Sequence, residues 1–384
     1  MTLTKCMFLS AALGCGLVFS SCSTLASKTT TGVVIARRAQ IRSSVAVVAA
    51  DLLEVARGDV LDILESSEVQ DQTVADTKEK WFRVRAHDDA GTEGWIEARN
   101  LLTEEMLAQS RKLADEDKAI PTQATGQLRN TSNLRLSPDY TTNDNVLMKM
   151  ENGATFDIVD WKRLPKTKIG DAQETGEDPK PGGTRPNTRP TPPTSGGSDE
   201  EPKGPEETTE LWYKVRLQPN VSPAPSGWIY GKQVELLVPA DIIFYRTGRD
   251  FVGWQRLDGD PEAHASSQPK DKDAAKEEKP GSWVILEKAS SSQPHTLDEP
   301  YFDRIYVVGY EKYDQEHYTA YRSPDLNGYL PMKIEGKGED KTFTLTVSGD
   351  DGQKREAVFR VYKDDRGHLK VTPPADLPKV TPKK

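Results

Sequence analysis

The chain has 384 residues and a formal net charge of −9, with 29% charged and 35% hydrophobic residues. This length predicts two or three domains. The low hydrophobic content predicts that part of the chain is linker. The acidic balance argues against nucleic acid as a partner, because binding to a phosphate backbone needs clustered lysine and arginine.

The N-terminus reads as a secretory signal peptide over residues 1–21. After Lys5 comes the apolar run "MFLSAALGCGLVF", about 13 residues long. Such a run is too short to span a bilayer and has the length of the apolar region of a secretory signal. The sequence therefore predicts export of the chain from the cytoplasm.

The stretch "LVFSSC" at the end of this run resembles the lipobox of bacterial lipoproteins, although Phe19 stands where leucine is usual. The resemblance implies that Cys22 is acylated, becomes the first mature residue and anchors the chain in a lipid bilayer. Ser23 beside it implies the outer membrane of a Gram-negative host, facing the periplasm. The alternative is an ordinary cleaved signal with an incidental Cys22.

The positions of the cysteines limit which disulfides and which thiol-dependent activities the mature chain could have. The three cysteines are Cys6, Cys15 and Cys22, so cleavage before Cys22 leaves one, which would carry lipid. No disulfide is then possible. A cysteine peptidase is excluded as well, because such an enzyme needs a free nucleophilic thiolate.

One pattern occurs twice in the chain. "EKWFRVRA" and "EGWIEA", around Trp81 and Trp95, return as "ELWYKVRL" and "SGWIYG", around Trp212 and Trp228. Upstream, residues 39–65 align without a gap to residues 134–160, which pairs Ile41 with Leu136 and Gly58 with Gly153. The shared features are short apolar strands and turn glycines, so the sequence predicts two copies of one β-module.

These motifs resemble the bacterial Src homology 3 domain, a small five-stranded barrel, over residues 33–102 and again over 125–237. A barrel of this size buries little apolar area. The four tryptophans could stack on sugars or on a peptide, but their positions in strands lead us to expect mainly core residues. The glycine before Trp95 and Trp228 is expected to allow a tight hairpin turn.

Aromatic residues that differ between the two copies are the candidates for ligand binding. Tyr140, Trp161 and Tyr230 stand where the alignment places Val45, Ser66 and Glu97 in the first copy. Rigid aromatic rings stack well on sugars and on protein surfaces. The alternative is that each ring covers the local core.

Two segments separate the folded parts. Residues 103–124 form a linker in which Met106, Leu107, Ser110 and Leu113 recur at helical spacing, so we expect a short helix there. The second copy carries an insert at about residues 165–209, rich in proline, glycine and acidic residues, with little to bury. This insert is expected to be disordered.

Residues 239–372 contain aromatic and β-branched runs separated by turn residues, which predicts a β-domain of about eight strands. A charged loop is expected at about 258–281 and a disordered tail at 373–384. The segments "FDRIYVVGY" and "YTAYRSPDLNGYLPM" resemble a C-terminal module of bacterial lipoproteins that carry Src homology 3 domains. No activity follows from that resemblance.

Seven of the twelve tyrosines lie within residues 301–329. They suit stacking on a sugar or a partner. Alternation, however, places Tyr306 and Val308 on one strand face and Ile305, Val307 and Tyr313 on the other, as in a strand packed on both sides. The second interpretation, packing in the core, is favoured.

The sequence shows no catalytic or metal-binding constellation. The five histidines are scattered, none has metal-ligand spacing, and no cysteine completes a zinc site. We expect no enzyme activity and no cofactor. The predicted fold class is all-β: two small tandem barrels, a short linker helix, a C-terminal β-sandwich or barrel-like domain, and disordered loops.

The function implied by these features is non-catalytic binding in the cell envelope by a lipid-anchored protein. Peptidoglycan or an envelope protein is the expected partner. The alternative is a structural or assembly lipoprotein whose barrels act as spacers or docking modules without binding glycan.

Overall fold

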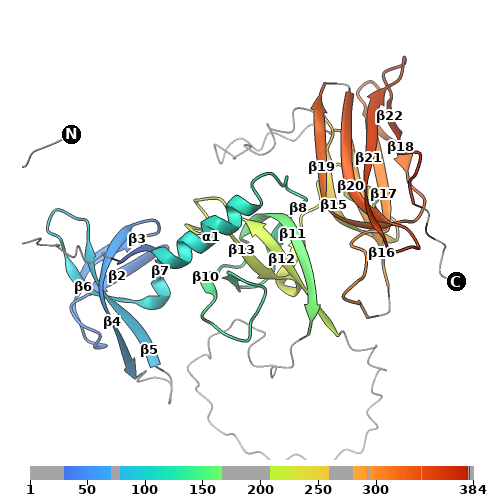
Figure 1. Ribbon diagram of the computed structural model, residues 1–384. Helices are drawn as coiled ribbons and strands as arrows, with labels where there is room; N and C mark the ends of the chain where they lie inside the picture. The colour runs from blue at the N-terminus through green and yellow to red at the C-terminus, as the bar shows by residue number, and fades with distance from the viewer. Residues whose placement is uncertain are drawn as a thin grey trace, which may run out of the picture.

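The computed structural model describes residues 30–70, 78–166, 208–258, 280–291, 294–338, 340–378 and 380. The signal peptide, Cys22, most of the insert, most of the charged loop and the end of the tail lie outside these residues. The described chain is mostly β, with one α-helix, as predicted. Figure 1 shows the two barrel-like sheets and the C-terminal sheets following one another along the molecule.

The first barrel is a curled antiparallel sheet in the order β3-β2-β6-β5-β4-β1-β7. Its strands are β1 (Thr30–Val34), β2 (Arg38–Arg42), β3 (Asp51–Ala56), β4 (Val60–Gln70), β5 (Lys78–Ala86), β6 (Glu93–Glu97) and β7 (Leu101–Thr103), with the 3-10 turn η1 (Ala98–Asn100) before β7. Its core is built from Ile41, Leu61, Val84 and Ile96 among others.

The second barrel has the same topology, in the order β10-β9-β13-β12-β11-β8-β14. Its strands are β8 (Ala124–Leu128), β9 (Ser132–Arg135), β10 (Val146–Met150), β11 (Thr155–Pro165), β12 (Thr209–Arg216), β13 (Ser226–Tyr230) and β14 (Val234–Leu236), with η3 (Gly231–Gln233) before β14. Each strand thus has its counterpart seven strands earlier. The doubled sequence pattern encodes a doubled fold.

The details of the long strands repeat as well. A bulge interrupts β4 after Ile63 and β11 after Ile158, at matching positions. Gly58 and Gly153 precede these strands with positive φ angles of 96° and 80°, a conformation that glycine adopts without strain. The alignment predicted from sequence is correct in this part of the module.

The predicted alignment is wrong at the first core strand. Arg42 pairs with Trp95 in the first barrel, and Arg135 pairs with Trp228 in the second. The counterpart of Ile41 is therefore Leu134, not Leu136, and both side chains are fully buried. The loop after this strand is two residues longer in the second barrel, which an ungapped alignment does not allow.

The glycines before Trp95 and Trp228 have a different role from the one expected. Gly94 lies within β6 and Gly227 within β13, not in the hairpin turns. A Cβ atom at Gly94 would lie 2.5 Å from the carbonyl oxygen of Arg42, and one at Gly227 would lie 2.9 Å from that of Arg135. Both glycines therefore allow close approach of the neighbouring strand.

The helix α1 (Glu104–Glu116) connects the barrels, as predicted (Figure 1). Its start is capped by Thr103, whose hydroxyl accepts a hydrogen bond from the Met106 amide. Its buried face presents Leu107 and Ser110. The Ser110 hydroxyl donates to the Ser226 carbonyl over 2.5 Å, which fixes the helix against β13.

The described residues of the C-terminal domain form eight strands in two four-stranded antiparallel sheets, the number and class predicted. One sheet holds β15 (Arg249–Arg256), β16 (Trp283–Ala289), β17 (Arg304–Glu311) and β18 (Glu316–Arg322). The other holds β19 (Asn327–Lys337), β20 (Asp340–Ser348), β21 (Lys354–Lys363) and β22 (Leu369–Thr372); a short turn, η4 (Ile243–Tyr245), precedes both sheets. The rings of Tyr321 and Phe359 meet between the sheets, with centroids 6.0 Å apart.

The tyrosine-rich segment is core only in part: of its seven tyrosines, Tyr306 is buried, Tyr313 is exposed and the other five are half-buried. Ile305, Tyr306, Val307 and Val308 are all buried, so β17 packs on both faces as predicted. Tyr313 differs, because it lies in the turn after β17 and is 96% exposed. Alternation of side chains placed Tyr313 on a strand face in the sequence analysis, but β17 ends at Glu311, before this residue.

The second barrel and the C-terminal domain share one continuous apolar core. Gln123, which is fully buried, links them: its amide nitrogen donates to the Met332 carbonyl, and its amide oxygen accepts from the Met332 amide over 2.7 Å. The first barrel keeps a separate core, and a few of its residues near α1 join the larger one. The second barrel and the C-terminal domain are therefore joined by a shared core, whereas the first barrel joins that core only through its residues near α1.

Candidate functional site

Strands β12 and β13 carry aromatic side chains on the face that points away from the barrel core. Tyr213, Val215 and Ile229 face the core. Side chains alternate along a strand, so Trp212 lies on the opposite face. There it stands beside its partner Tyr230, while Lys214 stands beside Trp228. The prediction that the tryptophans are mainly buried is confirmed for Trp81 and Trp212. It is wrong for Trp228, which is half-buried, and for the face on which Trp212 lies.

Trp212 is nevertheless only 1% exposed, because other aromatic rings cover it. Tyr140 stacks on it with ring centroids 6.0 Å apart and an interplanar angle of 23°. Tyr230 packs against both, at 5.4 Å from Trp212 and 5.9 Å from Tyr140. We call Tyr140, Trp212, Trp228 and Tyr230 the outer aromatic face.

Tyr140 comes from the loop at residues 136–145, which polar contacts hold in place. Arg135 donates to the Thr142 carbonyl over 2.7 Å, and Asn145 donates to the Asp139 carbonyl over 2.7 Å. The Tyr140 hydroxyl donates to the carboxylate of Glu210 at the start of β12. The ring is therefore presented in a defined position, which lowers the entropy that a ligand must offset.

The open part of this face consists of half-buried Tyr140 and Trp228. Trp228 lies between Lys214 and Arg135 on the neighbouring strands. Lys214 makes a 2.5 Å ion pair with Asp117 just beyond α1, so the helix end bounds the face on that side. The surface left between is aromatic, with cationic groups next to it.

The same face of the first barrel is different. Trp81 and Trp95 occupy the equivalent positions, but Glu97 stands where the second barrel has Tyr230. Arg83 pairs with Glu65 and Glu93 there. The first barrel therefore presents a charged face, and the aromatic face belongs to the second.

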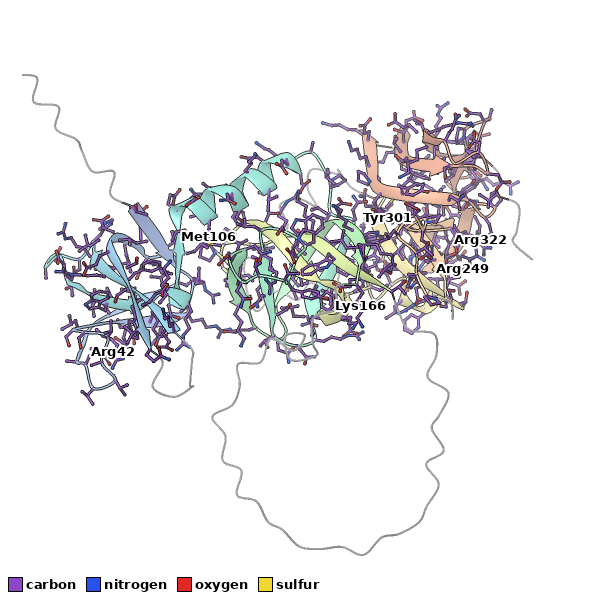
Figure 2. All side chains as sticks on the ribbon, turned by 60° about the horizontal axis from the view of Figure 1, so that its bottom comes forward. Arg42, Met106, Lys166, Arg249, Tyr301 and Arg322 are labelled. Carbon is purple, nitrogen blue, oxygen red and sulfur yellow. The ribbon has the colours of Figure 1, made fainter. Side chains whose placement is uncertain are left out.

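The third predicted ligand residue, Trp161, lies elsewhere. Its ring is 6% exposed and packs edge-on against Tyr213 and Tyr301. The Tyr301 hydroxyl donates to the Trp161 carbonyl over 3.2 Å. Figure 2 shows Tyr301 at the junction of the second barrel and the C-terminal sheets. The structure thus brings Tyr140 and Tyr230 together and places Trp161 in an interdomain contact.

Trp228, which the sequence predicted to be a core residue, is instead a member of the outer aromatic face. A signal was present in "WYKVR", where Lys214 and Arg216 share the alternation phase of Trp212. Charged residues in phase with a tryptophan indicate an outward face. Tyr213, in the other phase, is the core residue, and burial raises its pKa to about 12.

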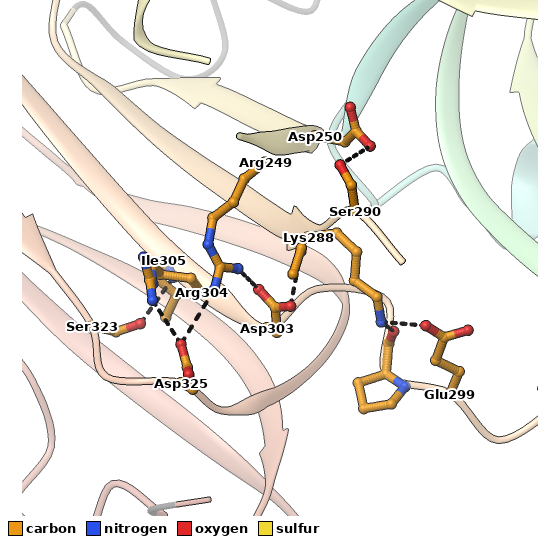
Figure 3. A network of polar contacts seen from close by, with 12 residues as sticks. Arg249, Asp250, Lys288, Ser290, Glu299, Asp303, Arg304, Ile305, Ser323 and Asp325 are labelled. Atoms are coloured by element: carbon orange, nitrogen blue, oxygen red, sulfur yellow. Dashed lines mark hydrogen bonds and ion pairs between the residues drawn. The ribbon is translucent and has the colours of Figure 1, made fainter. Parts of the chain in front are cut away.

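The C-terminal domain holds a second cluster of polar residues, drawn in Figure 3. Arg249 pairs with Asp303, and both Arg249 and Arg304 contact Asp325, over 3.4 and 2.8 Å. The Ala289 amide donates to Asp303. These contacts tie the ends of β15, β16 and β17 to the loop after β18, so the cluster is explained by the fold.

Buried Glu287 lies beside this cluster. Its Oε2 atom has no hydrogen-bond partner. Burial raises the pKa of this carboxyl, although Arg322, Arg249 and Arg304 act in the opposite direction. The side chain is therefore costly to ionise.

Within the residues described, no three histidine, cysteine, aspartate or glutamate side chains gather where they could hold a metal ion. No helix in this part of the chain is both long and apolar enough to cross a membrane. In comparisons with known proteins, no family model matches the chain and no curated protein matches it.

Proposed function

We propose that this chain is a lipid-anchored, non-catalytic binding protein of the bacterial cell envelope that attaches to peptidoglycan. The anchor is Cys22, as the lipobox resemblance implies. The binding modules are the two barrels, whose sequence motifs resemble bacterial Src homology 3 domains. The observation that carries the proposal is the outer aromatic face of the second barrel.

Sugar rings stack on aromatic side chains through their apolar C–H faces, and a rigid ring loses little conformational entropy on binding. Tyr140 and Trp228 are half-buried, so each offers an edge or face to a ligand while packing fixes its position. Trp212 and Tyr230 pack against the Tyr140 ring. This arrangement favours a glycan strand lying across β12 and β13.

A second candidate function is that of a spacer or docking scaffold. The observation in its favour is the extended succession of barrel, helix, barrel and β-domain in Figure 1. The continuous core of the second barrel and C-terminal domain would make such a spacer stiff. In that case the aromatic face would contact a protein.

Two experiments separate these functions. The mature chain, with Cys22→Ser to remove the acylation site, is sedimented with purified sacculi; peptidoglycan binding predicts that the protein pellets with them. Crosslinking of the acylated protein in cells tests the scaffold, which predicts a specific protein partner and no pelleting. Membrane fractionation of Cys22→Ala checks the anchor, since loss of acylation should release the chain or block its processing.

A further inference from the structure

An open cleft of about 470 Å³ lies between the two barrels. Three turns border it. The turn after β3 contributes Arg57, the turn after β10 contributes Glu151 and Asn152, and the connection between β12 and β13 contributes Asn220 and Val221. The cleft is separate from the outer aromatic face, since none of Tyr140, Trp212, Trp228 and Tyr230 lines it.

The charge of the cleft is opposite to that of the chain. Arg37, Arg57 and Lys149 line it, and the single carboxylate among its lining residues is that of Glu151. Three cations and one anion give a local charge of about +2, whereas the whole chain carries −9. The cleft therefore favours an anionic ligand.

The two arginines have different tasks. Arg57 donates to the Ile35 carbonyl over 2.8 Å and to the Val221 carbonyl over 2.7 Å, so it joins the barrels and stays as a fixed positive charge. Arg37 pairs with Glu151 over 2.5 Å. Their side chains are 75% and 57% exposed, and ion pairs this exposed contribute little stability.

We propose that the cleft binds a carboxylate of a peptidoglycan stem peptide, which replaces Glu151 as the partner of Arg37. Arg37 already holds a carboxylate in this place, so the exchange keeps the geometry of the pair. Asn152 and Asn220 also line the cleft, and an asparagine amide can both donate and accept hydrogen bonds with a peptide backbone. The inference rests on the proposed attachment to peptidoglycan and adds a second, charged subsite to the aromatic one.

The position of the cleft gives this binding a structural effect. The ligand would touch residues of both barrels, which otherwise have separate cores. A ligand that binds two units at once favours the arrangement in which both contacts are made. Stem-peptide binding should therefore exchange one contact between the barrels, the Arg37–Glu151 pair, and leave the hydrogen bond from Arg57 to the Val221 carbonyl in place.

The test uses the mature chain with Cys22→Ser and a muropeptide released from sacculi by muramidase digestion, measured by isothermal titration calorimetry. Arg37→Gln should weaken binding about tenfold, as expected for loss of a charge-assisted contact. Glu151→Gln should tighten binding, because the competing carboxylate is gone. Arg38→Gln is the matched control, since Arg38 is an exposed neighbour that pairs with Glu54 and does not line the cleft.

The same muropeptide with amidated carboxyl groups should bind as weakly to the parent chain as the free acid binds to Arg37→Gln. Equal binding of the acid and amidated forms would overturn the proposal, as would absence of muropeptide binding. Equal effects of Arg37→Gln and Arg38→Gln would also overturn it. Tighter binding of inorganic phosphate than of the muropeptide would reassign the cleft to a phosphate group.

These outcomes are distinguishable from failure of the proposed function. If the parent chain pellets with sacculi but Glu151→Gln and Arg37→Gln leave muropeptide affinity unchanged, the attachment stands and the cleft proposal is wrong. If the muropeptide binds with the predicted charge dependence but the protein does not pellet with intact sacculi, the cleft proposal stands and attachment to the assembled wall is wrong.

Discussion

Tyr140 stacks on Trp212 across the outer surface of the second barrel, joining a loop to the strand 72 positions later in the chain. The loop that carries Tyr140 is two residues longer than its counterpart in the first barrel. The Tyr140 hydroxyl donates to Glu210, and the Tyr230 ring packs against Tyr140. This group of three packed rings occurs in the second barrel, whereas in the first barrel Trp81 lies beside Glu97.

The two tryptophans of this surface should differ sharply in their effect on stability. Trp212→Ala removes a ring that is 1% exposed and should cost about 3 to 5 kcal/mol. Trp228→Ala removes a half-buried ring and should cost about 1 kcal/mol. Urea unfolding of the mature chain, followed by circular dichroism, measures both. Equal losses for the two variants would mean that Trp228 is a core residue.

The junction of the second barrel and the C-terminal domain should depend on Gln123. Gln123→Ala leaves the buried amide of Met332 without its hydrogen bond, which should cost about 1 to 3 kcal/mol. The Met332 carbonyl keeps the hydrogen bond that it accepts from Gln255 over 2.8 Å. Gln127→Ala is the control, because Gln127 makes one exposed hydrogen bond to the Gly153 carbonyl. Differential scanning calorimetry should show one shared transition that falls with Gln123→Ala. Two independent transitions in the parent chain would refute the coupling.

The insert between β11 and β12 should be replaceable by a short turn. The two strands stay paired up to Pro165 and Thr209, and the Lys166 amide donates to the Thr208 carbonyl over 2.8 Å. A two-residue Asn-Gly turn suits such a ladder. Replacing residues 167–207 with it should leave the melting temperature within a few degrees of the parent. A much larger drop would show that the replaced residues stabilise the fold.

Glu287→Gln should stabilise the chain at neutral pH. The folded-state pKa of Glu287 is raised above its unfolded value, so this residue favours folding below the ordinary pKa of 4.5 and loses that contribution as pH rises through the folded-state pKa. Glutamine keeps the shape and cannot ionise. The melting-temperature advantage of Glu287→Gln should therefore be larger at pH 7 than at pH 4. Destabilisation at pH 7 would mean that an ionised Glu287 pairs productively with the arginines.

Features that repeat along the chain were predictable from the sequence. The motifs around Trp81 and Trp212 predicted two copies of one β-module, and both copies have the same strand order. The eight C-terminal strands and the helix after Thr103 were also predictable, because alternation, turn residues and capping are local signals. Each of these depends on neighbours in sequence.

Features that depend on contacts between distant segments were not predictable. The burial of Trp161 comes from Tyr301, 140 positions later, and no local pattern announces that partner. The burial of Gln123 depends in the same way on Met332. For Trp212 the alternation did contain the answer, but the expectation that a large ring belongs in the core of a small barrel outweighed it. The length difference in the Tyr140 loop also shifted the predicted pairing of Ile41.

The measurement that tests the account most directly is sedimentation of the mature chain with purified sacculi, comparing the parent, Trp228→Ala and Trp95→Ala. Trp95 is the matched control, because it occupies the equivalent position in the first barrel and is also half-buried. We expect Trp228→Ala to stay folded by circular dichroism and to lose most of its binding, while Trp95→Ala binds like the parent. Undiminished binding by folded Trp228→Ala would contradict the assignment of the outer aromatic face as the site of attachment.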